Sequence, residues 1–316
     1  MIDFKTRTLA ASALTAVLFS GASQAADPAA CQTVRFSDVG WTDITATTAA
    51  ASEVLKGLGY TPEVQILSVP VTYASLKNKD IDVFLGNWMP TMEADIASYR
   101  DEGSVETVRT NLTGAKYTLA VPKSLADQGL KDFADIARFR DELDGKIYGI
   151  EPGNDGNRLI QSMIDADAFG LKGFKVVESS EQGMLAQVAR ATKRNKAIVF
   201  LGWEPHPMNA NFELAYLAGG DDYFGPDFGG ATVATNVRAG YAQECPNVGA
   251  LLANMEFSLA MENEIMSAIL DQGEEPDAAA KSWLAANPAT VSGWLDGVTT
   301  IDGKDGLAAV KPYLGL

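Results

Sequence analysis

Strand-like and helix-like segments alternate twice along this chain. In the first run, the apolar segments 32–40, 62–69 and 82–88 are separated by the helical patterns 43–60 and 73–81. Strands that alternate with helices in this way form a mainly parallel sheet with helices packed on its faces. The sequence therefore predicts an α/β fold.

The second run begins near residue 116 and has the same character. It contains strand-like segments at 116–122, 146–153, 174–178 and 197–203, and helical patterns at 131–143, 158–169 and 183–195. Segment 231–238 then reads as a returning strand, and 250–272 reads as one helix because its leucines and methionines recur at roughly helical spacing.

Two similar α/β units and a long C-terminal segment predict a two-lobe molecule with a hinge between the lobes. With 316 residues the chain is long enough for two domains. We predict that residues 26–112 and 229–316 form lobe one, and that residues 113–228 form lobe two. The chain would then cross between the lobes near residues 110–114 and 226–232.

Residues 1–25 have the pattern of a secretory signal peptide. Lys5 and Arg7 precede a short apolar segment, 9–20, and the small residues at 23–25 suit cleavage after Ala25. A lipoprotein anchor would need a cysteine directly after the apolar segment, and Cys31 stands too far along. The sequence predicts a periplasmic protein that is released by cleavage.

The chain is strongly acidic, with a formal net charge of −16. Such a surface repels nucleic acid and anionic membranes and mildly favours cationic partners. Acidity that serves only to keep the protein soluble is the alternative. We expect a monomer that binds no nucleic acid.

The chain contains two cysteines, Cys31 and Cys245. In an exported protein, an even number of cysteines favours a disulfide, which would join the start of the mature chain to its last quarter. Two buried free thiols are the alternative. Two cysteines and the single His206 are too few for a structural zinc site, and we expect neither a metal nor a cofactor.

Two phrases, 82–90 and 197–207, are nearly the same: an apolar run, Leu-Gly, a tryptophan and then a proline. Ligands of open parallel sheets bind beyond the carboxyl ends of the strands. Trp41, Trp88 and Trp203 all follow apolar runs, and Tyr117 lies beside the expected hinge. These aromatic residues are therefore candidates for a cleft between the lobes, although tryptophans at strand ends also serve as core residues.

A cage of aromatic rings suits a quaternary ammonium ion in particular. Such a cation has no N–H group, so it leaves no unsatisfied donor when it is moved among rings, whereas a primary amine would lose about 1–3 kcal/mol for each unsatisfied group. Each well-placed ring contributes about 0.5–2 kcal/mol through the cation–π interaction. Four rings would supply a large share of the roughly 8 kcal/mol that micromolar binding requires.

Polar residues near the rings narrow the ligand class. Asp43 stands two residues after Trp41, and the glycine-rich turn 149–158 presents Asn154 and Asp155. If Asp43 faces the cleft, it favours a cation with a hydroxyl group and disfavours a zwitterion with a carboxylate. The alternatives are a helix N-cap for Asp43 and a plain chain reversal for the turn, which has no phosphate-binding signature.

Five phrases together resemble the periplasmic substrate-binding proteins of quaternary-amine ABC transporters, the glycine betaine/choline family, with the choline-specific members nearest. They are GWTDITATTAAASEVLKGLGY, DVFLGNWMP, YGIEPGNDGN, FLGWEPHPMN and WLAANPATVSGWL. The resemblance covers the whole mature chain. It implies a type II-like periplasmic binding protein fold, whose lobes close on a ligand, and a membrane permease as partner.

The resemblance also implies roles for individual residues. The rings that match the ammonium box are Trp41, Trp88, Tyr117 and Trp203, and those that match the holders of the choline hydroxyl are Asp43 and Asn154. It implies choline as the ligand, with acetylcholine left open. His206 matches a Trp-x-Pro-His phrase of the family, and we expect it to have a structural role.

Three other functions remain open. A glycine betaine or carnitine binder is the nearest alternative, and a receptor component that presents its closed form to a sensor cannot be distinguished by sequence. An exported choline-ester hydrolase is remote, because the chain has no G-x-S-x-G motif, no metal cluster and one histidine. We therefore assign no catalytic residues and expect a binding protein that is not an enzyme.

Overall fold

A computed structural model describes residues 27–316. The signal peptide predicted at 1–25 lies outside the described residues. The strands are β1 Thr33–Asp38, β2 Thr61–Ile66, β3 Val83–Met89, β4 Val105–Pro122, β5 Lys146–Tyr148, β6 Lys175–Val177, β7 Phe200–Glu204, β8 Leu214–Tyr216 and β9 Gly230–Arg238.

The helices are α1 Thr42–Gly57, α2 Val69–Asn78, α3 Glu93–Asp101, α4 Lys123–Asp127, α5 Asp155–Asp165, α6 Glu181–Lys193, α7 Met208–Asn211, α8 Asp221–Phe224, α9 Pro226–Gly229, α10 Tyr241–Glu244, α11 Pro246–Asn254, α12 Leu259–Leu270, α13 Pro276–Ala286, α14 Pro288–Trp294 and α15 Gly306–Leu314. Short 3-10 helices are η1 Ala29–Cys31, η2 Phe133–Phe139 and η3 Ala168–Gly170.

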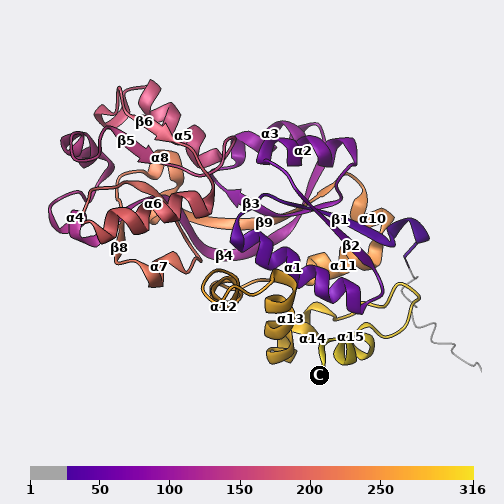
Figure 1. Ribbon diagram of the computed structural model, residues 1–316. Coiled ribbons are helices and arrows are strands. Elements are labelled where there is room, and N and C mark those ends of the chain that lie inside the picture. The colour runs from indigo at the N-terminus through magenta and orange to yellow at the C-terminus, as the bar shows by residue number, and fades with distance from the viewer. Residues whose placement is uncertain (1–26) are drawn as a thin grey trace, which may run out of the picture.

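The described strands follow one path in the order β2-β1-β3-β9-β4-β7-β5-β6, with β8 beside β4. β1 is parallel to β2 and β3, and β5 is parallel to β6 and β7. The central pairs β3–β9, β9–β4 and β4–β7 are antiparallel. The predicted α/β fold with two lobes is confirmed: a parallel group of strands forms each end, and β4 and β9 join them (Figure 1).

β4 changes partner where it passes from one lobe to the other. Its residues from Val105 to Lys116 pair with β9, and its residues from Lys116 to Ala120 pair with β7. We use lobe one for the elements around β1–β3 with α11–α15, and lobe two for those around β5–β7 with α4–α8. The sequence boundaries of the lobes at 112/113 and 228/229 stay a prediction.

The C-terminal helices return to lobe one. α12, α13 and α15 pack against α1, which lies between them and the sheet (Figure 1). This explains why α1 is buried along most of its length, including its alanines and Val54 and Leu55. The C-terminal segment therefore holds in place the helix whose first turn carries Trp41 and Asp43 to the cleft.

Two of the predicted elements are wrong in detail. The segment 250–272 is two helices, α11 and α12, because the N–H of Phe257 bonds to the carbonyl of Asn111 and the hydroxyl of Ser258 accepts from the N–H of Met261, starting a new helix. Within segment 131–143 only Phe133–Phe139 is helical, as the 3-10 helix η2, which Asp132 begins with a capping box. The spacing of apolar residues alone does not reveal the helix caps at Ser258 and Asp132.

The predicted disulfide joins Cys31 to Cys245, with Cα atoms 5.7 Å apart. It ties η1, just before β1, to the start of α11. The bond lies at the amino end of β1, the opposite end of the strand from Trp41. It therefore stabilises lobe one at a distance from the aromatic residues.

Replacing both cysteines by serine is expected to lower the free energy of unfolding by about 2–4 kcal/mol, because the bond closes a long loop and restricts the unfolded chain. Urea denaturation followed by far-UV circular dichroism measures this, with the same wild-type protein under reducing conditions as a control. An unchanged midpoint in the double variant would show that the bond adds nothing to stability.

No described helix between residues 27 and 316 is both long and apolar enough to cross a bilayer.

Candidate functional site

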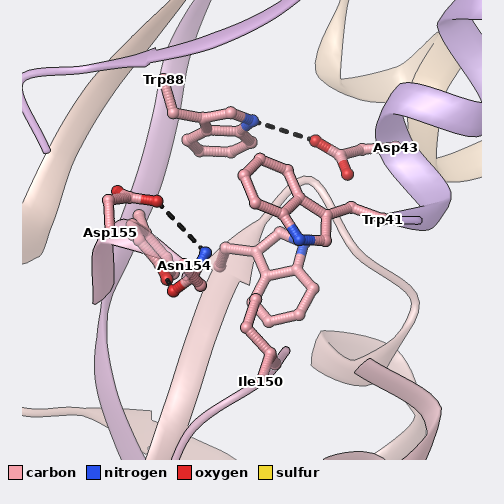
Figure 2. A pocket seen from close by; sticks show the side chains of 8 residues that line it. Trp41, Asp43, Trp88, Ile150, Asn154 and Asp155 are labelled. Atoms are coloured by element: carbon pink, nitrogen blue, oxygen red, sulfur yellow. Dashed lines mark hydrogen bonds between the residues drawn. The ribbon is translucent and has the colours of Figure 1, made fainter. Parts of the chain in front are cut away.

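All six residues predicted to contact a ligand line one small pocket between the lobes. The pocket is lined by Trp41, Asp43, Trp88, Tyr117, Ile150, Asn154, Asp155 and Trp203 (Figure 2). Trp41, Asp43 and Trp88 come from lobe one, and the others come from β4 and lobe two. That these side chains contact a ligand stays a prediction.

The aromatic residues reach the pocket from strand ends and helix starts. Trp88 and Trp203 are the last residues but one of β3 and β7, so they lie within the strands. Trp41 is the N-cap residue of α1. In both repeated phrases the proline two residues after the tryptophan has a cis peptide bond.

The rings lie close to one another and are largely excluded from water. The ring centroids of Trp88 and Tyr117 are 6.0 Å apart, and those of Tyr117 and Trp203 are 6.3 Å apart. Tyr117 is also paired directly with Trp203 across the β4–β7 ladder. Each ring residue, Trp41 included, is no more than 5 % exposed.

Hydrogen bonds at the edges of three rings fix their orientation. The indole N–H of Trp88 donates to Oδ2 of Asp43 at 3.1 Å, as Figure 2 shows. The indole N–H of Trp41 donates to Glu151 at 2.7 Å, and the Tyr117 hydroxyl donates to Oδ1 of Asn154 at 2.8 Å. The polar edges of these three rings therefore already have partners within the protein.

Asp43 has an oxygen without a partner. Its Oδ1 is buried and forms no hydrogen bond with the described residues. Burial, and then the negative charge of Glu181, raise the pKa of Asp43 to about 8. Asp43 is not the N-cap of α1, so the capping alternative is wrong. An unpaired buried oxygen is costly, and here it lies at the wall of a pocket.

Asn154 holds the turn that the sequence singled out. It is the N-cap of α5, where its Oδ1 accepts from the N–H of Asn157, and its Nδ2 donates to Oδ1 of Asp155 (Figure 2). Gly156 leaves room for the Tyr117 hydroxyl, because a Cβ there would lie 2.1 Å from that oxygen. The turn therefore positions both Asn154 and Tyr117.

Two lining residues, Ile150 and Asp155, were absent from the predicted set of contacts. Asp155 is buried, its Oδ2 has no hydrogen-bond partner among the described residues, and burial raises its pKa to about 6. The signal for Asp155 was its place in the glycine-rich turn beside Asn154. Burial also raises the pKa of Glu151, the acceptor for Trp41, to about 7.

The electrostatics of the site are one-sided. Among residues 27–316, two carboxyl groups, Asp43 and Asp155, line the pocket, and no lysine or arginine does. Raised pKa values mean that burying these carboxylates without a positive charge is unfavourable. The described residues contain no cluster of three side chains able to hold a metal ion. Aromatic rings and buried carboxyl groups therefore line the same pocket, a composition that suits an organic cation.

His206 does not line the pocket. Its Nδ1 accepts from the N–H of Met208 at 2.9 Å, and its Nε2 lies 3.2 Å from Glu181. Its ring packs edge-on against Trp203 with centroids 4.9 Å apart. Both nitrogens are engaged within the protein, which agrees with a structural role.

The fold and the pocket thus define a two-lobe ligand-binding protein, and comparison with known proteins identifies its family. Residues 32–286 match the family described as the substrate-binding domain of ABC-type glycine betaine transport systems. The chain belongs to this family.

Solved structures support the same assignment. An ABC-transporter choline-binding protein in complex with choline is 70 % identical, covers 92 % of this chain and all of that one, and superposes with a TM-score of 0.91. A choline-binding protein in an unliganded semi-closed conformation is 71 % identical, with 91 % and 100 % covered and a TM-score of 0.84.

A lactococcal OpuAC in its closed-liganded conformation, complexed with glycine betaine, is 25 % identical, with 83 % of this chain and 98 % of that chain covered and a TM-score of 0.75. Of the two choline-binding structures, the one with choline bound is more similar to the structure described here.

Proposed function

We propose that this protein captures choline in the periplasm between its two lobes and delivers it to the permease of an ABC importer, without catalysing a reaction. The observation that carries the proposal is the unpartnered Oδ1 of Asp43 at the wall of a pocket made of aromatic rings. The ammonium group would lie against the faces of Trp41, Trp88, Tyr117 and Trp203. The hydroxyl group would donate to Asp43.

The high identity to a protein solved with choline supports this ligand. The charge of the site supports it as well, because a ligand with a carboxylate would meet Asp43 and Asp155 in a pocket that no lysine or arginine of the described chain lines. Glycine betaine carries such a carboxylate. Choline carries the same ammonium group with a hydroxyl donor in its place.

Closure would couple binding to the lobe arrangement. Lobe one supplies Trp41, Asp43 and Trp88, while lobe two and β4 supply Tyr117, Asn154 and Trp203. Neither set alone surrounds an ammonium ion, so a ligand that contacts both stabilises the closed form. A cleaved signal peptide and a permease partner complete the proposed role in uptake.

Isothermal titration calorimetry with choline, acetylcholine and glycine betaine tests the proposal. We expect choline to bind with micromolar or tighter affinity and glycine betaine to bind at least about tenfold more weakly, because its carboxylate meets like charge. Equal or stronger binding of glycine betaine would overturn the choline assignment and leave the family. Hydrolysis of acetylcholine to choline in the same samples would contradict the proposal that the protein catalyses no reaction.

A further inference from the structure

A buried carboxylate outside the pocket bridges the two lobes. Glu181 is the first residue of α6 in lobe two, and it is 1 % exposed. Its Oε2 accepts from the N–H of Thr42 at 2.9 Å, and its Oε1 accepts from the Thr42 hydroxyl at 2.6 Å. Thr42 is the first residue of α1 in lobe one, 139 positions earlier in the chain.

This contact caps the N-terminus of α1, which has no side-chain cap from its own N-cap residue. The N-cap residue of α1 is Trp41, whose side chain makes no capping hydrogen bond. The first N–H groups of a helix lack partners inside the helix and carry a partial positive charge. The carboxylate of Glu181 satisfies one of these groups and places a negative charge at the helix end, so α1 is capped from the opposite lobe.

The same carboxylate is joined to lobe two through His206. Because Nδ1 of His206 accepts from the N–H of Met208, Nε2 is the ring nitrogen that donates, and it lies 3.2 Å from Oε1 of Glu181. The His206 ring also lies against Trp203. Glu181 therefore connects Thr42, which stands between Trp41 and Asp43, to the histidine that packs on Trp203.

We propose that Glu181 is a positioning residue for the closed binding site, which caps α1 across the cleft and so prolongs the lifetime of the liganded state. This inference rests on the proposed capture of a ligand between closing lobes. When the lobes separate, the Thr42 N–H and hydroxyl and the Glu181 carboxylate return to water. The contact therefore opposes opening, and it does not act on the first encounter with the ligand.

The contact should affect the dissociation rate constant of the ligand and leave the association rate constant nearly unchanged. A contact made only after closure slows dissociation and leaves association almost unchanged. Hydrogen bonds to a buried carboxylate are stronger than neutral ones, and removing one partner leaves the other unsatisfied. We expect Glu181→Ala to raise the choline dissociation rate tenfold or more and to change the association rate by less than about twofold.

Stopped-flow tryptophan fluorescence with choline measures both rates. Thr42→Val removes the hydroxyl donor and is expected to raise the dissociation rate several-fold, whereas Thr42→Ser keeps the hydroxyl and should stay near wild type. In the double variant Thr42→Val/Glu181→Ala the losses should not add, because the partners act on one another. Glu142→Ala, which changes an exposed glutamate of lobe two, is the matched control.

Three outcomes would overturn the role of Glu181: a dissociation rate within twofold of wild type in Glu181→Ala, fully additive losses in the double variant, or a loss confined to the melting temperature of the ligand-free protein. The last would show that Glu181 supports folding and not closure. A wild-type protein that binds no choline would instead contradict the proposed function. If the alanine variant folds poorly, Glu181→Gln, which keeps one acceptor oxygen, replaces it. Its dissociation rate should lie between the wild-type rate and the rate expected for Glu181→Ala.

Discussion

Replacing Trp203 by alanine is expected to weaken choline binding by about a hundredfold or more. A desolvated cation–π contact contributes about 2 kcal/mol, and truncating a buried aromatic ring also removes a wall of the pocket. Every 1.4 kcal/mol corresponds to a tenfold change in affinity. Trp203 is 4 % exposed, faces Tyr117 across the β4–β7 ladder and lines the pocket, so its loss opens the site from lobe two.

Calorimetry of the alanine, phenylalanine and leucine variants of Trp203 separates the cation–π contribution to choline affinity from the contribution of apolar burial. Trp203→Phe keeps an aromatic face and should lose less affinity than Trp203→Leu, which keeps apolar volume without a π system. Trp283→Ala is the matched control, because Trp283 in α13 does not line the pocket and its indole N–H donates to Glu264. The melting temperature of each ligand-free variant reports whether it folds.

A neutral analogue of choline sharpens the result. In 3,3-dimethylbutan-1-ol a carbon atom replaces the nitrogen, so the shape and hydroxyl are kept and the charge is lost. We expect the wild-type protein to prefer choline by about tenfold or more, and Trp203→Leu to reduce that preference. Equal losses of both ligands in Trp203→Leu would mean that the ring contributes only apolar contact.

The alternation of strands and helices was sufficient to predict the two parallel groups of strands, because buried strands and amphipathic helices differ in apolar period. It also placed Trp41 and Trp88 at one edge, because β1 and β3 are parallel and their carboxyl ends lie together. Trp203 belongs to the other parallel group, which the antiparallel strands β9 and β4 join to the first. The break between α11 and α12 could not be predicted in the same way. It depends on a hydrogen bond from Phe257 to Asn111, which lies far away in the sequence.

The contacts across the cleft could not be predicted from the sequence. Trp41 donates to Glu151 and Thr42 is capped by Glu181, and both partners lie more than a hundred positions away. Such pairs depend on how the lobes close, which no local pattern encodes. Asp155 could have been found, because it follows Asn154 in the same turn and that turn begins α5.

The acceptor group of Asp43 should be the other large determinant of affinity. We expect Asp43→Asn to weaken choline binding about tenfold to a hundredfold, because a hydrogen bond to a charged acceptor contributes about 1.5–3 kcal/mol. Asparagine is the informative replacement: its side-chain oxygen can still accept from the indole N–H of Trp88, which now bonds to Oδ2 of Asp43. The same change should narrow the preference for choline over glycine betaine. An unchanged ratio would show that Asp43 does not select the ligand.

The pH dependence of binding tests whether that carboxylate is ionised in the complex. Burial raises the pKa of Asp43 to about 8, and burial raises those of Glu151 and Asp155 to about 7 and about 6. A bound cation favours the charged form of each, so protons must leave as choline enters and the affinity must rise with pH. Choline does not titrate in this range, so any change of affinity with pH is due to titrating groups of the protein.

We expect calorimetry between pH 5 and pH 8 to show up to about a tenfold gain in affinity per pH unit for each proton released. The slope should be smaller in Asp43→Asn, since one titrating group is gone, and buffers of different ionisation enthalpy should reveal fewer protons released. Identical slopes in the two proteins would mean that Asp43 does not change its protonation state when choline binds.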